Sequence, residues 1–119
     1  MGAYKDLIVW NESYEQVKEI YKITKDFPDL ERYGLISQMR RASVSVPANI
    51  AEGYGRKHPK EYNQFISIAL GSCNELEVYF LLSKDIGYID EATKNRLMEK
   101  NLNIGKMLSA LRTAIEKQK

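Results

Sequence analysis

The chain has 119 residues, of which 44% are apolar and 29% charged, and this balance is typical of one folded domain covering residues 1–119. One cysteine excludes an internal disulfide framework, and one histidine excludes any site built from several imidazoles. The net charge of +2 is smaller than expected of a protein that only coats nucleic acid.

Apolar residues at heptad spacing predict a first helix that begins near residue 7 and ends before Pro28. We expect Trp10 to lie in the core, near Ile50 of the second helix. The expected core face of the first helix is Leu7, Trp10, Tyr14, Val17, Tyr21 and Thr24.

A second helix is predicted from about Tyr33 to Gly53. Pro47 lies inside it and removes one backbone hydrogen bond, which predicts a kink over residues 43–47. The hydroxyl groups of Ser43 and Ser45 are candidates to satisfy the freed carbonyls. The expected core face is Leu35, Met39, Ala42, Val46, Ile50 and Gly53.

The third predicted helix begins at Pro59 and ends near Gly87, and the fourth begins after the capping residue Asp90. The third carries core positions at Tyr62, Phe65 or Ile66, Ala69, Cys73, Leu76 and Phe80. The fourth carries core positions at Leu97, Asn101, Ile104, Leu108, Leu111 and Ile115.

Short connections between four amphipathic segments predict an all-α fold, an antiparallel up-down-up-down four-helix bundle. In this register Arg40 and Arg41 lie level with Glu75. A structural ion pair between these arginines and Glu75 is the simpler interpretation, with contact to a ligand as the alternative.

Catalytic chemistry has little support in the sequence. A carboxylate-bridged metal pair in a bundle needs Glu-x-x-His motifs, and no glutamate lies three residues before His58. Cys73 falls on a core position without a histidine to activate it. We therefore expect no catalytic residues, no metal and no cofactor.

Basic residues gather between the second and third helices, at Arg56, Lys57 and Lys60. Together with Tyr54 and Tyr62 this cluster is a candidate phosphate-binding and base-stacking site. The alternative is a loop whose charges only serve solubility.

The third helix carries more apolar surface than one bundle seam needs, including Ile68, Tyr79 and Leu82. This wide apolar arc predicts self-association. No run of 18 apolar residues and no signal peptide is present, so we expect a cytoplasmic protein that does not cross a membrane.

The segment from Ser37 to Arg56, SQMRRASVSVPANIAEGYGR, closely resembles the signature of the four-helix-bundle proteins encoded in intervening sequences of 23S ribosomal RNA genes. Leu7–Trp10, Phe27–Pro28 and the segment Ile68–Ser72 followed by Glu75 and Leu76 also resemble that family. His58-Pro59 departs from its usual helix start and removes a side-chain cap.

The resemblance implies a bundle that assembles as a ring, typically a homopentamer. It also implies a relation to the accessory variability proteins of diversity-generating retroelements, which bind RNA or DNA beside a reverse transcriptase. The leading hypothesis is thus a non-enzymatic homo-oligomer that binds structured RNA or DNA. Its candidate contacts are Arg56, Lys57 and Lys60, with Arg40 and Arg41 added if they face a ligand. The alternative is a protein-interaction scaffold with no nucleic-acid role.

Overall fold

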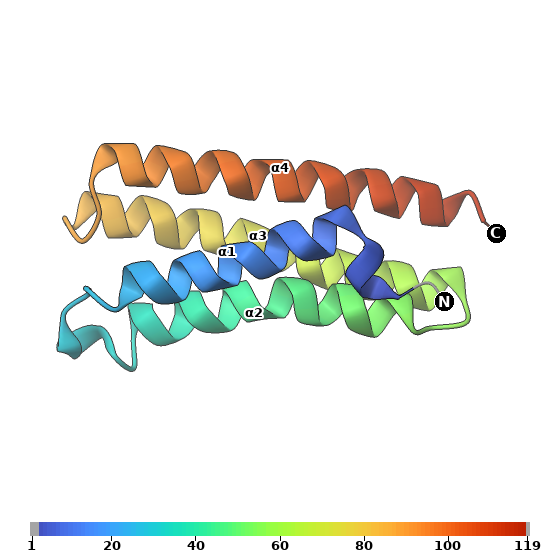
Figure 1. Ribbon diagram of the computed structural model, residues 1–119, viewed down its shortest axis with the longest axis horizontal. Coiled ribbons are helices and arrows are strands. Elements are labelled where there is room, and N and C mark those ends of the chain that lie inside the picture. Colours follow the sequence, from blue (N-terminus) through green and yellow to red (C-terminus); the bar gives the residue numbers. More distant parts are fainter. Residues whose placement is uncertain (1–2, 119) are drawn as a thin grey trace.

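The computed structural model describes residues 3–118, which form four packed α-helices and no strand. The helices are α1 (Ile8–Thr24), α2 (Leu35–Tyr54), α3 (Pro59–Asp85) and α4 (Glu91–Glu116). Two short 3-10 helices, η1 (Tyr4–Asp6) and η2 (Asp29–Glu31), precede α1 and α2. Figure 1 shows that successive helices run in opposite directions, with both chain ends and the α2–α3 turn at one end of the bundle.

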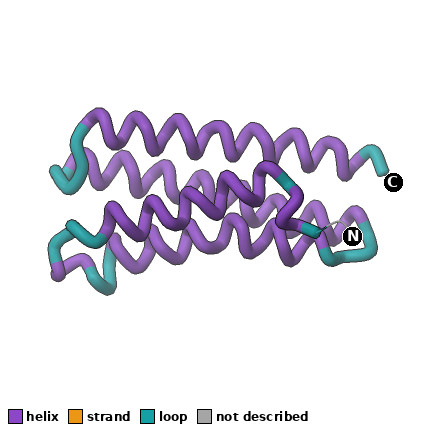
Figure 2. The backbone as a smooth tube through the Cα atoms, in the orientation of Figure 1, coloured by secondary structure: helices purple, strands orange, loops and turns teal. Residues whose placement is uncertain are grey.

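Loops and turns connect the helices (Figure 2), and nearby residues fix their conformations. The Asp90 carboxylate accepts a hydrogen bond from the Thr93 backbone N–H at 2.8 Å and so caps α4 as predicted. Gly87, after α3, has a φ of +88°, a conformation that glycine adopts without strain. The segment before α2 forms η2, so that helix begins at Leu35 rather than Tyr33.

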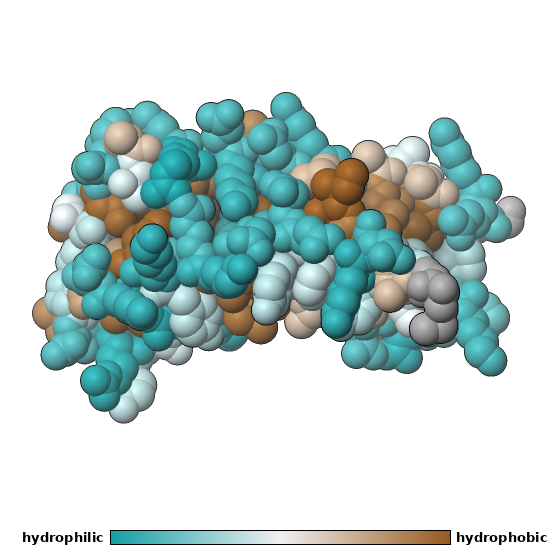
Figure 3. Space-filling view, in the orientation of Figure 1, coloured by the Kyte–Doolittle hydropathy of each residue, from teal (hydrophilic) through white to brown (hydrophobic). Residues whose placement is uncertain are grey.

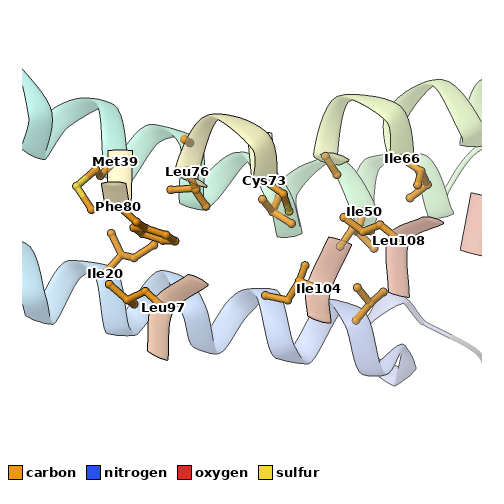
Figure 4. Packing of buried hydrophobic residues seen from close by; sticks show 14 of the residues in the cluster. Ile20, Met39, Ile50, Ile66, Cys73, Leu76, Phe80, Leu97, Ile104 and Leu108 are labelled. Atoms are coloured by element: carbon orange, nitrogen blue, oxygen red, sulfur yellow. The ribbon is translucent and has the colours of Figure 1, made fainter. Parts of the chain in front are cut away.

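The core lies along the common axis of the four helices, and Figure 4 shows its buried side chains converging from all of them. All six expected core positions of α2 are buried, and so are five of the six expected in α4; Leu111 is half-buried. In α3 the buried apolar residues are Ile66, Ala69, Cys73, Leu76 and Phe80. These three predicted faces are therefore confirmed in all but their edge positions.

The predicted core face of α1 is wrong by about one residue, except at Thr24, which is buried as expected. The buried positions are Val9, Ser13, Gln16, Ile20 and Thr24. Trp10 is half-buried rather than in the core, and it lies against Pro47, Ala48 and Ala51 of α2. Tyr14 and Tyr21 are 45% and 41% exposed.

A polar contact accompanies this orientation of α1. The Gln16 amide donates to Asn101 Oδ1 of α4 at 3.4 Å, and Asn101 Nδ2 donates to the Cys73 carbonyl of α3 at 2.8 Å. Buried amides cost free energy unless they find such partners. The contact offsets part of the cost of burying Gln16, whose Oε1 atom has no hydrogen-bond partner among the described residues.

Helix α2 continues through Pro47 without a break. The Ser43 hydroxyl donates to the Arg40 carbonyl at 2.9 Å, and the Asn49 amide donates to the Ser45 carbonyl at 2.8 Å. The Ser43 hydroxyl therefore serves a carbonyl other than the one that Pro47 frees four residues earlier. The kink itself remains a prediction.

Helix α3 is the one described helix long and apolar enough, by length and composition alone, to cross a membrane. Its core face packs between α2 and α4, and core helices of other folded proteins pass the same test. Figure 3 shows one face of the molecule, which is largely hydrophilic. The composition of α3 is therefore weak evidence for a membrane span.

Candidate nucleic-acid interface

The basic cluster lies in the α2–α3 turn, where close contact fixes the backbone. A Cβ atom added to Gly53 would lie 2.9 Å from Phe65 Cβ and 3.1 Å from the Tyr62 carbonyl oxygen. Only glycine allows the end of α2 to approach α3 this closely. The chain then reverses over residues 55–58, and α3 begins at Pro59, which favours a first helical position.

The three basic side chains of the turn differ in how freely they face solvent. The Arg56 guanidinium lies 2.5 Å from a Glu52 carboxylate oxygen and 4.9 Å from the centre of the Phe65 ring. Lys57 and Lys60 are both exposed, and neither forms an ion pair within residues 3–118. The two lysines are thus free to contact an anion.

The N-terminus of α3 adds to this positive potential. Its N-cap residue, His58, gives no side-chain hydrogen bond to the first turn, as the departure from the family pattern indicated. A helix N-terminus with uncapped N–H groups favours anions. Glu61 lies in the same turn and opposes part of this effect.

Helix α4 brings a fourth basic residue, Arg112, beside the three of the turn, which the sequence did not reveal. Lys60 and Arg112 line one surface hollow with Asn63, Ser67 and the acidic Glu116. The Asn63 amide donates to the Arg112 carbonyl at 3.3 Å, which holds the two helices together here. The sequence could have indicated this neighbour, because antiparallel helices place residues after 110 beside the start of α3.

The two tyrosines of the candidate site form an edge-to-face pair, with ring centres 6.1 Å apart. Tyr54 is 36% exposed, whereas Tyr62 is half-buried and packs against the core. Burial raises the pKa of Tyr62 above its ordinary value. Tyr54 is therefore the tyrosine of this pair with the more accessible ring.

Arg40 and Arg41 lie elsewhere. About 15 helical residues separate them from Arg56, roughly 20 Å along α2 at the usual rise. Arg41 forms the expected ion pair with Glu75. Arg40 does not: its Nε donates to the Thr24 hydroxyl at 2.9 Å, and its guanidinium stacks 4.5 Å from the Tyr21 ring centre. Adjacent helical residues point about 100° apart, so one reaches α3 and the other α1.

The residues predicted for self-association lie on or beside the solvent side of α3. Ile68 is 52% exposed and Leu82 is 45% exposed. Tyr79 is half-buried, and its hydroxyl donates to Glu75 at 2.6 Å, a hydrogen bond that raises the pKa of Tyr79. The exposed apolar area of α3 is thus real, but Tyr79 lies at its edge.

Neither the potential metal ligands nor the cysteine is arranged in a way that favours catalysis. Within residues 3–118 no three His, Cys, Asp or Glu side chains are grouped to hold a metal. Cys73 is 4% exposed, and burial raises its pKa to about 12. The Cys73 thiol is therefore protonated at neutral pH and a poor nucleophile.

Comparison with known proteins identifies the family. Residues 5–110 match the model of the 23S rRNA-intervening sequence protein family. A protein of unknown function from the S23 ribosomal protein family of Bacteroides thetaiotaomicron has a similar structure, with a TM-score of 0.80 at 23% identity over 88% of this chain and 98% of that one. Comparison with curated proteins gives no match. The match over residues 5–110 spans nearly the whole chain, which therefore belongs to the 23S rRNA-intervening sequence protein family.

Proposed function

We propose that this protein is a self-associating bundle without enzymatic activity that binds structured RNA or DNA through Arg56, Lys57 and Lys60. One observation carries the proposal: two unpaired lysines lie at the uncapped N-terminus of the longest helix, beside Arg112 of α4. Phosphate is the ligand that suits lysine side chains, a helix dipole and free backbone N–H groups together.

Arg40 and Arg41 have no part in this proposed site. Their guanidinium groups are engaged with Thr24 and Glu75, and they lie midway along the bundle. Contact with phosphate there would require breaking intramolecular contacts, whereas Lys57 and Lys60 need no such change.

Self-association would multiply the charge of the turn. The family resemblance implies a pentameric ring, in which five copies of the turn would lie on one rim. Such repetition strengthens a weakly basic surface far more than the +2 charge of one chain suggests. We extend the proposal to a cytoplasmic location and, through the resemblance to accessory variability proteins, to a reverse transcriptase as partner.

A protein-interaction scaffold is the second candidate function. It is favoured by the exposed apolar side chains of α3, which exceed what the bundle core uses. This alternative shares self-association with the first candidate but predicts no salt-dependent affinity for nucleic acid.

The test is a titration of nuclease-treated protein into a labelled RNA hairpin and a labelled DNA duplex, followed by fluorescence anisotropy over a range of salt. We expect affinity to fall steeply with salt, because phosphate contacts release counterions. Lys57→Glu/Lys60→Glu should weaken binding roughly tenfold or more and lower the slope of log affinity against log salt by about two.

Arg32→Glu/Lys106→Glu is the matched control, since it changes the net charge equally at two exposed positions away from the turn. It should bind nearly as the wild type does. Equal losses of affinity in both variants would indicate a nonspecific effect of net charge and would contradict the proposed site in the α2–α3 turn. No binding at low salt would favour the scaffold.

A further inference from the structure

A surface hollow lies between the first turns of α3 and the last turns of α4, at the end of the bundle that holds the α2–α3 turn (Figure 1). Its volume is about 690 Å³, within the range of roughly 300–1,000 Å³ that binding sites for small molecules occupy. Most of its walls are polar or charged: Lys60, Asn63, Gln64 and Ser67 of α3, and Arg112 and Glu116 of α4. We call this site the Arg112 hollow.

The two walls of the Arg112 hollow are held in place by the fold. The Asn63 amide donates to the Arg112 carbonyl at 3.3 Å and joins α3 to α4 at this level. The neighbouring residues Ile66 and Ile115 are buried in the core and anchor both helices. A ligand therefore meets walls whose backbone is already in position, which lowers the cost of binding.

The Arg112 side chain crosses the hollow toward α3. Its Nη1 atom donates to the Ser67 hydroxyl at 3.5 Å. Glu116 lies one turn further along α4, yet Arg112 forms no ion pair with it or with any other carboxylate within residues 3–118. Arg112 is also half-buried. A guanidinium that has lost part of its hydration without gaining a carboxylate gains free energy from a bound anion.

Lys60 supplies a second positive charge on the α3 wall. It is exposed and forms no ion pair among the described residues. Glu116 is the one carboxylate among the lining residues, so two cations and one anion give these walls a net charge of +1. The hollow therefore favours an anion, and Glu116 opposes part of that preference.

Among the phosphates of a nucleic acid, the one at a strand end suits this hollow best. An internal phosphodiester carries one negative charge and two free oxygens, whereas a phosphomonoester carries about 1.5–2 negative charges at neutral pH and three free oxygens. A guanidinium can bind two of these oxygens side by side, and a lysine can bind the third. A recess between two helices also receives a strand that stops there more readily than a continuous backbone, which must lie across both rims.

The other residues around the hollow agree with such a ligand. Gln64 and Ser67 offer an amide and a hydroxyl to the sugar or base of the terminal nucleotide. Lys57 does not line the hollow and lies on the turn itself. It is therefore available to the phosphodiesters that follow the strand end.

From these observations we infer that the Arg112 hollow binds the terminal phosphate of an RNA or DNA strand, with Arg112 and Lys60 holding its oxygens. The inference rests on the nucleic-acid binding in the proposed function. It narrows the ligand from structured nucleic acid in general to strand ends that carry a phosphomonoester.

The test compares one hairpin RNA in three forms: with a 5′-phosphate, with a 3′-phosphate, and with hydroxyl groups at both ends. Fluorescence anisotropy at a fixed salt concentration gives a Kd for each form. We expect at least one phosphorylated form to bind about tenfold more tightly than the hydroxyl form, because charge-assisted hydrogen bonds are the strong ones. The difference between the 5′ and 3′ forms shows which strand end the hollow holds.

Variants decide whether this preference comes from the hollow, since the extra charge of a terminal phosphate strengthens any nonspecific attraction. Arg112→Gln and Lys60→Gln should each reduce the preference to about twofold or less. Lys57→Gln is the matched control: it removes one charge from the turn outside the hollow, so it should weaken all forms alike and keep the preference. Circular dichroism must show unchanged helical content. Lys60→Gln changes an exposed position and keeps the test decisive if Arg112→Gln unfolds the chain.

A carboxylate variant should shift the preference in the opposite direction. Glu116→Gln removes the negative charge from the hollow and should increase the preference for the phosphorylated form roughly twofold. Glu99→Gln removes the same charge from an exposed position of α4 that does not line the hollow, and it should leave the preference unchanged.

The outcomes separate this inference from the proposed function. Equal affinity for all three forms, with binding that still falls with salt, would overturn the inference alone. It would also be overturned by a preference that persists in both Arg112→Gln and Lys60→Gln, or by a free nucleoside monophosphate that competes as tightly as the phosphorylated hairpin binds. No binding of any form at low salt would overturn the proposed function and this inference together.

Discussion

In the interior of the bundle two amides, Gln16 and Asn101, lie buried between apolar layers, whereas the solvent side of α3 exposes Ile68, Val78 and Leu82. The two amides are hydrogen-bonded to each other, and Asn101 also donates to the Cys73 carbonyl, which offsets part of the cost of their burial. The exposed apolar residues have no such compensation within one chain. The fold therefore depends on one side of α3, and the self-association that we propose would depend on the other.

The largest expected effect is the loss of unfolding free energy when a buried leucine, rather than an exposed one, is replaced with alanine. Leu108 is fully buried and Leu82 is 45% exposed. Val78→Arg places a charge on the exposed apolar side of α3, so we expect this variant to be a monomer. In the Val78→Arg background, Leu108→Ala should lower the free energy of unfolding by about 2–5 kcal/mol. Leu82→Ala should change it by less than about 0.5 kcal/mol. Urea denaturation measures both, and a large loss for Leu82→Ala would assign that side chain to the core.

Burial of the Cys73 thiol should also make the free energy of unfolding depend on pH. Burial raises the pKa of Cys73 from 9.0 to about 12, so the unfolded chain loses the thiol proton first. The stabilising contribution of this thiol is complete below pH 9 and declines between pH 9 and 12, by about 1.4 kcal/mol per pH unit.

Cys73→Ala isolates this effect from the tyrosines and lysines that titrate in the same range. The difference in unfolding free energy between wild type and Cys73→Ala should shrink steadily above pH 9. A constant difference would mean that solvent reaches the thiol in the folded state.

The buried amides offer the next test. Asn101→Ala leaves the Gln16 amide without its partner and should cost about 1–3 kcal/mol in unfolding free energy. Gln16→Leu/Asn101→Leu removes both amides and should be nearly neutral or stabilising by comparison. Chemical denaturation compares the two variants, and equal losses in both would show that the hydrogen bond itself contributes little.

The sequence predicted the faces of α2 and α4 because each offers a single apolar row at helical spacing. It also predicted the core row of α3, despite the wider apolar arc of that helix, because Ala69, Cys73, Leu76 and Phe80 keep heptad spacing. It failed on α1 because two rows lie one residue apart. The aromatic row through Trp10 and Tyr14 is the more apolar, whereas the buried row contains Ser13 and Gln16. The hydrogen bond from Gln16 to Asn101 of α4, which is distant in sequence, offsets part of the cost of burying this row.

The same distinction between local and distant information applies to the candidate site. Arg56, Lys57 and Lys60 are neighbours in sequence and could be grouped from it directly. Arg112 joins Lys60 only because α4 ends beside the start of α3, which depends on the lengths of both helices. The separate directions of Arg40 and Arg41 likewise depend on which neighbouring helix each side chain reaches.

The smallest expected effect comes from replacing a helical glycine with alanine. One such substitution should stabilise the fold of the single chain and weaken its self-association. Gly71 and Gly105 both lie inside helices with open space where a Cβ atom would be. Replacing either with alanine should raise the unfolding free energy of the Val78→Arg monomer by about 0.4–1 kcal/mol.

The two glycine variants should diverge once the chain can assemble. In the wild-type background Gly71→Ala should weaken association, because the added methyl group lies on the exposed side of α3 that we propose for self-association, while Gly105→Ala should leave association unchanged. Thermal unfolding and sedimentation over a dilution series give the two readouts. A glycine retained against its own helix propensity is then explained by the neighbouring chain, whereas equal association of both variants would remove Gly71 from the interface.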